Sequence, residues 1–245
     1  MNTREHYSYR VYSDPKMARD FDHDRFGGPI GELIKNNQEQ LVFRTLPDVQ
    51  NWKVIDVGAG TGRITLPFLS RGADVTACDA SAEMLEVLKQ KANHPALHVF
   101  VADAHQLQFP DHAFNCAISF RMLLHVVDWR KALSELCRVS KEWLVIDFPP
   151  RHGFLLFAPM LHAFKRSFSK NHQSYRILSI CEVRRELNKN GFEVFGMDPG
   201  FFLPLSIHRF VERPGFTTKI EKFFKSIRLA RVAGSPITLF ARRGK

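Results

Sequence analysis

Short apolar runs alternate along the chain with longer segments in which apolar residues recur every three or four positions. The runs predict buried strands and the longer segments predict amphipathic helices. The predicted strands cover residues 53–57, 74–79, 97–101, 114–120, 143–148, 192–195 and 236–241. Regular alternation of strand and helix is typical of a parallel sheet covered by helices on both faces. We therefore expect an α/β fold.

Polar residues mark where several of the predicted helices begin. Residues 14–46 predict two helices, separated at Gly27-Gly28-Pro29. Ser81 and Asp128 are suitable N-caps for the helices that follow them. Residues 179–182 (Ser-Ile-Cys-Glu) have the spacing of a capping box, and Asn190-Gly191 ends the helix behind them.

Composition excludes several classes of protein. The 245 residues are 44% hydrophobic and 24% charged, an ordinary globular mixture that rules out a disordered chain. The four cysteines form no C-x-x-C pair, so we expect no metal site, no disulfide framework and a reducing, cytoplasmic location. No apolar run reaches the ~18 residues that a membrane span needs, and the polar N-terminus does not resemble a signal peptide.

Charge is distributed unevenly along the chain. Residues 1–150 hold 17 basic and 19 acidic side chains, whereas residues 151–245 hold 18 basic and 6 acidic ones and 14 of the 22 phenylalanines. Two stretches in this second part, 149–177 and 199–234, follow no αβ alternation, and connections of that length are usually functional. They indicate either a surface for an anionic partner, lipid or nucleic acid, or a solvated basic face over a phenylalanine-rich core.

A glycine-rich loop follows the first predicted strand. Gly58-Ala59-Gly60-Thr61-Gly62 lies between that strand and a helix predicted at about 63–70. Glycines let a backbone approach a ligand closely, and the helix N-terminus offers free N–H groups to an anion. Arg63 stands where the third glycine of a dinucleotide-binding G-x-G-x-x-G would be, so a nicotinamide or flavin dinucleotide fits poorly.

Residues 54–62 (Val-Ile-Asp-Val-Gly-Ala-Gly-Thr-Gly) closely resemble motif I of the class I S-adenosylmethionine-dependent methyltransferases. The resemblance continues in register through four further segments, of which 107–111 and 124–128 are similar to the subgroup that includes quinone-biosynthesis methyltransferases. These segments are Cys78-Asp79-Ala80-Ser81 with Met84-Leu85, Ala102-Asp103-Ala104, Leu107-Gln108-Phe109-Pro110-Asp111 and Leu124-His125-Val126-Val127-Asp128. The resemblance implies a three-layer, Rossmann-like fold with a seven-stranded, mostly parallel sheet and an antiparallel last strand.

The same resemblance implies a set of residues that bind S-adenosylmethionine. Asp79 would hold the ribose diol and Asp103 with the following amide would face the adenine, while Asp56 and Asp103 would favour the cationic sulfonium and ammonium groups. The implied set is Asp56, Gly58, Ala59, Gly60, Thr61, Gly62, Asp79, Ala80, Met84, Asp103, Ala104 and Phe120.

Candidates for the acceptor side follow the fourth predicted strand. Arg121 and Met122 lie where the family's acceptor pocket begins, and His208 is a further candidate. His125 is the nearest general base, or alternatively a histidine packed at the start of a helix. Tyr7, Tyr9 and Tyr12 are candidates to close over the cofactor.

The resemblance predicts one methyltransferase domain over residues 1–245. Residues 1–50 would form an N-terminal helical cap and 51–148 the cofactor-binding core. Residues 149–177 and 199–234 would form basic, phenylalanine-rich insertions that act as an acceptor lid or face a membrane. The second insertion includes a predicted helix with basic and apolar residues interleaved; the basic ones are Lys219, Lys222, Lys225, Arg228 and Arg231.

The expected activity is therefore transfer of a methyl group to a small-molecule or lipid-like acceptor, with peripheral contact to a membrane. RNA methylation is an alternative because the second part of the chain is basic, although no RNA-binding module is visible. A further alternative is a non-catalytic protein that keeps the cofactor fold and binds a partner or membrane through residues 149–234.

Overall fold

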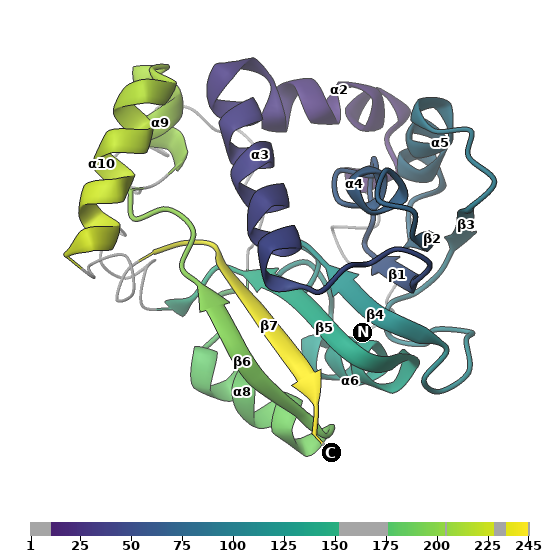
Figure 1. Ribbon diagram of the computed structural model, residues 1–245. Helices are drawn as coiled ribbons and strands as arrows, with labels where there is room; N and C mark the ends of the chain where they lie inside the picture. Colours follow the sequence, from purple (N-terminus) through teal and green to yellow (C-terminus); the bar gives the residue numbers. More distant parts are fainter. Residues whose placement is uncertain (1–10, 152–175, 204, 228–233, 245) are drawn as a thin grey trace.

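In the computed structural model, the seven predicted strands form a single sheet (Figure 1). The structure describes residues 11–151, 176–203, 205–227 and 234–244. The helices are α2 (Pro15–Phe26), α3 (Gly28–Thr45), α4 (Thr65–Leu69), α5 (Ala82–Lys91), α6 (Trp129–Val139), α8 (Ile180–Lys189), α9 (Leu205–Val211) and α10 (Pro214–Ser226). The strands are β1 (Lys53–Val57), β2 (Asp74–Asp79), β3 (Leu97–Val101), β4 (Phe114–Ser119), β5 (Ser140–Phe148), β6 (Phe192–Asp198) and β7 (Ile237–Arg243).

The strand order is β3-β2-β1-β4-β5-β7-β6, and only β7 runs antiparallel to its neighbours. This arrangement confirms the expected fold class. Because β1 to β5 run in one direction, their carboxyl ends lie along one edge of the sheet. The loops that leave this edge are therefore neighbours in space, although they are far apart in sequence.

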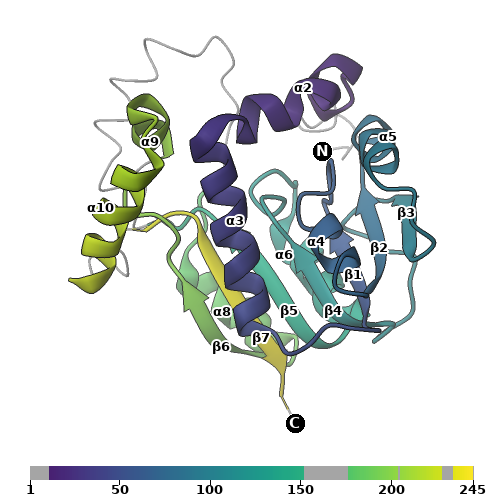
Figure 2. The same ribbon diagram turned by 45° about the horizontal axis from the view of Figure 1, so that its top comes forward.

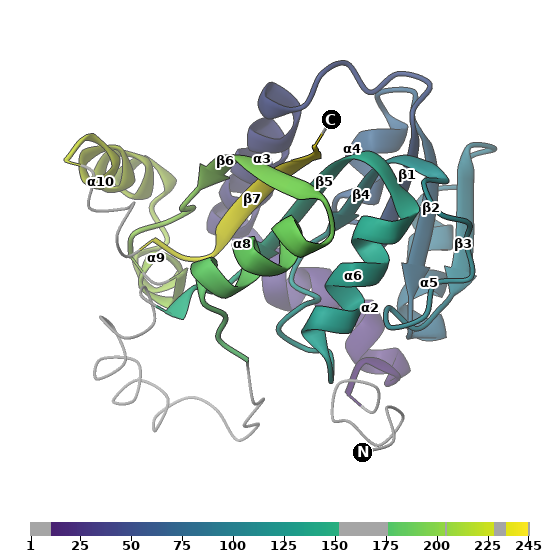
Figure 3. The same cartoon turned by 90° about the horizontal axis from the view of Figure 1, so that it is seen from below.

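Helices cover both faces of the sheet, which makes three layers (Figures 2 and 3). On one face, α6 and α8 bury Leu133, Leu136, Val183 and Leu187 against the strands. On the other face, α3 and α4 pack against the alternate residues of the same strands. The central strands are consequently buried on both sides, as their unbroken apolar runs predict, whereas the edge strands β3 and β6 are partly exposed.

Several element boundaries differ from the sequence prediction. The start of β5 is at Ser140 rather than residue 143, and β6 and β7 are longer than expected because they pair with each other from Phe192–Arg243 to Asp198–Thr238. The predicted capping box is wrong. Ser179 is the N-cap of α8 but makes no capping hydrogen bond, and Glu182 instead pairs with Arg130 of α6 across 3.5 Å.

Three helices lie near the edge at which the parallel strands end. In Figure 2, α2 crosses from α3 to α5, and α9 and α10 stand beside α3. Gly27 caps α2, and Gly28, with φ +73°, lets the chain turn into α3. Helix α10 ends at Ser226, so Arg228 and Arg231, like most of segment 149–177, lie outside the described residues. Within the described part of the chain, no helix is both long and apolar enough to cross a bilayer.

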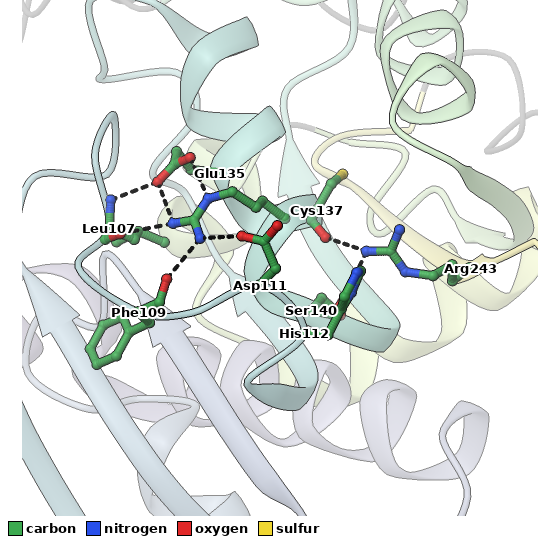
Figure 4. A network of polar contacts seen from close by, with 9 residues as sticks. Leu107, Phe109, Asp111, His112, Glu135, Cys137, Ser140 and Arg243 are labelled. Atoms are coloured by element: carbon green, nitrogen blue, oxygen red, sulfur yellow. Dashed lines mark hydrogen bonds and ion pairs between the residues drawn. The ribbon is translucent and has the colours of Figure 1, made fainter.

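Two arginines fasten loops to the α6–β5 region (Figure 4). Arg138 of α6 donates to the carbonyls of Leu107 and Phe109 at 2.8 and 2.7 Å, and it also pairs with Glu135 and Asp111. Arg243 at the end of β7 donates to the carbonyls of Cys137 and Ser140 at 2.6 and 2.7 Å. Each guanidinium group therefore satisfies backbone carbonyl acceptors of a neighbouring segment.

Replacing Arg138 by Met should lower the free energy of unfolding by about 1–3 kcal/mol, because two backbone carbonyls and Glu135 lose their donor. Arg130→Met on the same helix is the matched control. Arg130 pairs with Glu182 and Glu186 and lies over the ring of Trp129, but among the described residues it donates to no backbone carbonyl, so its loss should cost less than about 1 kcal/mol. Urea unfolding measures both values. Equal losses in the two variants would contradict this account.

Candidate functional site

A cavity opens at the edge where the parallel strands end. Its walls come from the loops after β1, β2, β3 and β4 and from α2, and it encloses about 1090 Å³ including its open mouth. The cavity is concave and lies at the carboxyl ends of the parallel strands, where ligands of such sheets bind. Its lining combines the glycine loop, two carboxyl groups and two guanidinium groups with aromatic side chains.

The glycine loop requires glycine at both of its ends. Gly58 has φ +76°, and a Cβ there would lie 2.7 Å from Cβ of Met122. Gly62 has φ +87°, and its Cβ would lie 2.3 Å from Cδ1 of Leu88. The loop is fastened to the neighbouring strand because the amides of Gly58 and Ala59 donate to the carbonyl of Cys78. Its backbone therefore lies at the cavity in one defined conformation.

Asp79 joins the ends of β1 and β2. Its Oδ2 accepts a hydrogen bond from the Gly60 amide at 2.8 Å, and its Oδ1 accepts one from the Ser81 amide at 2.9 Å. The carboxyl group lines the cavity, and burial raises its pKa above the ordinary range. The structure thus places an acceptor carboxylate directly beside the glycine loop.

Asp56 lies deeper, at the end of β1, and is 2% exposed. Thr65 of α4 donates its hydroxyl to Oδ2 at 2.7 Å. Burial raises the pKa of Asp56 to about 7, and the Thr65 hydrogen bond and the charge of Arg63 offset only part of this rise. A cation bound in the cavity would favour the ionised form of this group.

Arg63 lines the same cavity and is held by aromatic rings. Its guanidinium carbon lies 4.7 Å from the ring centroid of Phe26 and 5.7 Å from that of Phe120. Burial, together with the charge of Arg121, lowers its pKa to about 10. Among the described residues, no acid lies within ion-pair distance of this guanidinium and none accepts a hydrogen bond from it. In the sequence, this residue is noticeable only because it stands where the third glycine of a G-x-G-x-x-G motif would be.

Arg121 has a left-handed backbone, with φ +61°. Its amide donates to Oδ1 of Asp147, and its Nε lies 3.5 Å from Oδ2 of the same side chain. Asp147 is fully buried at the end of β5 and also accepts a hydrogen bond from Gln38 of α3 at 3.3 Å. Three distant segments therefore hold one unusual backbone conformation at the cavity wall.

His125 and Tyr12 meet at the mouth of the cavity. Nε2 of His125 lies 3.3 Å from the hydroxyl of Tyr12, and the two rings are edge-on with centroids 5.5 Å apart. The hydroxyl of Ser81 donates to the carbonyl of Tyr12 at 2.7 Å, which ties this part of the chain to the start of α5. Tyr7 and Tyr9 lie outside the described residues.

Most of the residues singled out in the sequence line this one cavity, and the structure adds others. Those brought together are Tyr12, Asp56, Gly58, Ala59, Gly60, Thr61, Asp79, Ala80, Met84, Ala104, Phe120, Arg121, Met122 and His125. The additional lining residues are Phe21, Phe26, Val57, Arg63, Ile64, Ser81, Ala102 and Val126. Sequence reasoning missed Phe21 and Phe26 because they belong to α2, where a core role is the ordinary expectation.

Gly62, Asp103 and His208 were also singled out in the sequence, but they do not line this cavity. Gly62 forms the turn into α4. Oδ1 of Asp103 lies 2.5 Å from Nδ1 of His105. Nε2 of the same histidine accepts a hydrogen bond from the Asp128 amide, so Nδ1 carries the ring proton and donates it to Asp103. The residues on either side of Asp103 do line the cavity.

His208 is buried between α9 and α10 instead of facing the cavity. It is 1% exposed, and its two ring nitrogens lie 2.9 Å from Glu221 and 3.1 Å from Thr217. Glu221 also accepts hydrogen bonds from the amides of Phe202 and Leu203, so the histidine belongs to an internal hydrogen-bond network. This arrangement does not support the expectation that His208 contacts the acceptor.

Known proteins resemble this chain in sequence and in fold. Residues 55–143 match the family described as "Methyltransferase domain". A demethylmenaquinone methyltransferase of Paenarthrobacter aurescens is 42% identical over 165 residues, which are 66% of this chain and 61% of that protein. A second one, from Streptomyces avermitilis, is 31% identical, and the match covers 69% of this chain and 66% of that protein. The chain thus spans less than two thirds of these two relatives.

Two further proteins match over more of their length. An uncharacterised protein of Methanocaldococcus jannaschii is 32% identical over 211 residues, covering 77% of this chain and 81% of that protein. The crystal structure of magnesium protoporphyrin IX methyltransferase from Synechocystis, with bound S-adenosylhomocysteine, matches with a TM-score of 0.63 and 18% identity. That match covers 94% of this chain and all of that one, and at this identity it speaks for the fold.

The raised pKa of Asp56 has a consequence for stability. Between about pH 4 and pH 7 the folded protein keeps a proton that the unfolded chain has lost, so the free energy of unfolding falls as pH rises through this window. The loss is up to about 1.4 kcal/mol per pH unit. Asp56→Asn removes this contribution and keeps an oxygen that accepts from Thr65. Its stability relative to wild type should therefore increase between pH 5 and pH 7.5.

Urea unfolding at both pH values measures this difference. Asp20→Asn, on the exposed side of α2, is the control for removing one carboxylate. A stability difference between Asp56→Asn and wild type that stays constant with pH would contradict the assignment.

Proposed function

Since the chain belongs to the class I S-adenosylmethionine-dependent methyltransferases, we propose that it transfers the cofactor's methyl group to a small-molecule or lipid-like acceptor of the quinone type. The observation that carries this proposal is the single cavity in which the glycine loop, Asp79, Arg121 and His125 meet. When bound, the cofactor supplies an electrophilic methyl group on a sulfonium. The quinone type of acceptor is supported by the two demethylmenaquinone methyltransferases that resemble the chain.

The cavity fits the cofactor group by group. Asp79 has the acceptor oxygens that a ribose diol requires and stands at the glycine loop. Asp56 would face the ammonium, and Arg63, which lacks an acidic partner among the described residues, would pair with the carboxylate. Met84 and Ala104 would flank the adenine. The ammonium and the carboxylate of the cofactor's amino-acid part would each meet a group of opposite charge in this chain.

On the acceptor side, the chain's own groups position the nucleophile, exclude water and hold its proton. Methyl transfer is an in-line displacement, so much of the rate can come from orientation in a closed site. Phe21, Phe26 and Phe120 supply apolar walls. His125 would accept the proton of an acceptor hydroxyl at Nε2, where the Tyr12 hydroxyl now lies 3.3 Å away.

Helices α9 and α10 carry a surface suited to anionic lipid. Phe210, Phe216 and Phe223 are 80%, 50% and 55% exposed, and Lys219 stands on the same pair of helices. Large exposed aromatic groups interleaved with lysines are typical of helices that lie in a membrane interface. We propose that this surface brings the protein to a membrane that holds a lipid-like acceptor.

The cofactor assignment predicts that Asp79→Ala weakens binding of S-adenosylhomocysteine at least tenfold, because a charged hydrogen-bond acceptor contributes about 1.5–3 kcal/mol. Asp74→Ala, at the opposite end of β2, should leave the affinity unchanged. Isothermal titration gives both dissociation constants. Equal affinities in a folded Asp79→Ala protein would remove Asp79 from the site.

The membrane surface predicts that the double variant Phe216→Ser, Phe223→Ser sediments at least tenfold less with phosphatidylglycerol vesicles, since each buried Phe contributes about 1.5–3 kcal/mol. Phe100→Ser is the matched control, because Phe100 is 48% exposed on the β3 edge, far from α10. Neutral phosphatidylcholine vesicles test the part played by charge. Undiminished sedimentation of the double variant would exclude this surface.

A further inference from the structure

A second cavity lies on the other side of Arg121. It is bounded by α3, α10 and the segments at the ends of β6 and β7, and it encloses about 1080 Å³ including its opening. Part of its wall is apolar and comes from Leu33, Ile34, Leu41, Phe201 and Pro236. Within the described part of the chain, Arg121 is the one residue that lines both cavities, so it lies between them.

The guanidinium of Arg121 is only partly used by the protein. Its Nε faces Asp147 at 3.5 Å, whereas its two terminal nitrogens have no hydrogen-bond partner among the described residues. The side chain is 38% exposed toward the cavities. The left-handed backbone at this position is strained for a residue other than glycine, and Asp147, which also accepts a hydrogen bond from Gln38, holds it through the Arg121 amide. Such strain indicates that the direction of this side chain matters.

Two other arginines lie within electrostatic reach of Arg121. One is Arg63, which lines the first cavity with it, and the other is Arg209 of α9. The acid that contacts Arg121, Asp147, is fully buried. An anion bound at Arg121 would relieve the repulsion among the three guanidinium groups.

We propose that the two terminal nitrogens of Arg121 bind an oxyanion of the acceptor, a carboxylate or a phenolate, and that the rest of an elongated acceptor extends into the second cavity. This inference rests on the proposed function and specifies its substrate class. A guanidinium presents two parallel N–H donors that match two oxygens of a carboxylate, and it stabilises a phenolate by charge. The apolar wall of the second cavity suits a ring or chain attached to that group.

Three naphthalene probes distinguish the two anions from a neutral group of similar size. They are 2-naphthoate, 2-naphthol and 2-naphthalenemethanol, and equilibrium dialysis in the presence of S-adenosylhomocysteine gives their affinities at pH 7 and pH 9.5. A carboxylate site should bind 2-naphthoate at least tenfold tighter than the neutral alcohol at pH 7. A phenolate site should instead bind 2-naphthol at least tenfold tighter at pH 9.5, where it ionises, than at pH 7.

Arg121→Gln should remove the preference for the anion and leave the affinity for 2-naphthalenemethanol within twofold. Arg121→Lys keeps the charge but not the planar pair of donors, so an intermediate preference is expected. Arg185→Gln on the exposed side of α8 is the matched control and should behave as wild type.

Two results would overturn the proposal. One is a wild-type protein that binds the neutral alcohol as tightly as either anion, a comparison that does not depend on any variant folding. The other is an anion preference that survives in Arg121→Gln. S-Adenosylhomocysteine affinity is measured in the same proteins. If the wild-type protein does not bind S-adenosylhomocysteine, the result counts against the proposed function. If it binds S-adenosylhomocysteine but shows no preference for the anions, the result counts against this inference alone.

Discussion

Parallel pairing of β1 with β2 and β4 is the constraint on which the site depends. The register sets Val57 beside Cys78 and Asp56 beside Ile118, so three loops leave the sheet at one level. Asp79 can then reach the Gly60 amide, although 19 residues separate them. The core on both faces holds the strands in this register, because a slip of one residue would turn every buried side chain to the opposite face.

The cavity contains two ionisable groups, Asp56 and Arg63, whose charged forms are destabilised by burial. Asp56 is held near neutrality by burial, with a pKa of about 7, and Arg63 lies between two aromatic rings without an acidic partner among the described residues. Groups of this kind reduce the stability of the empty protein and strengthen binding of a ligand with complementary charges. A zwitterionic amino-acid group has both charges, which is the chemistry that the cofactor of this family brings.

The acceptor side is assembled from more distant segments than the cofactor side. Arg121 follows β4, Asp147 ends β5 and Gln38 belongs to α3, yet hydrogen bonds connect the three. Helix α10 closes the outer wall of the second cavity, and the buried His208–Glu221 pair fixes α9 to it. Variation in these outer segments can therefore change the acceptor while the cofactor loop stays the same.

The strands, the glycine loop and the acidic residues at successive strand ends could all be predicted from the sequence. Apolar runs and glycine spacing are local patterns, and their physical causes, burial and backbone freedom, act within a few residues. The pairing of Arg121 with Asp147, the place of Arg63 between two aromatic rings, the internal position of His208 and the second cavity could not be predicted from the sequence. Each depends on partners such as Asp147 and Gln38, which are 109 residues apart. Only tertiary packing decides which buried charges meet, because a side chain's partner depends on three-dimensional distance and not on separation along the chain.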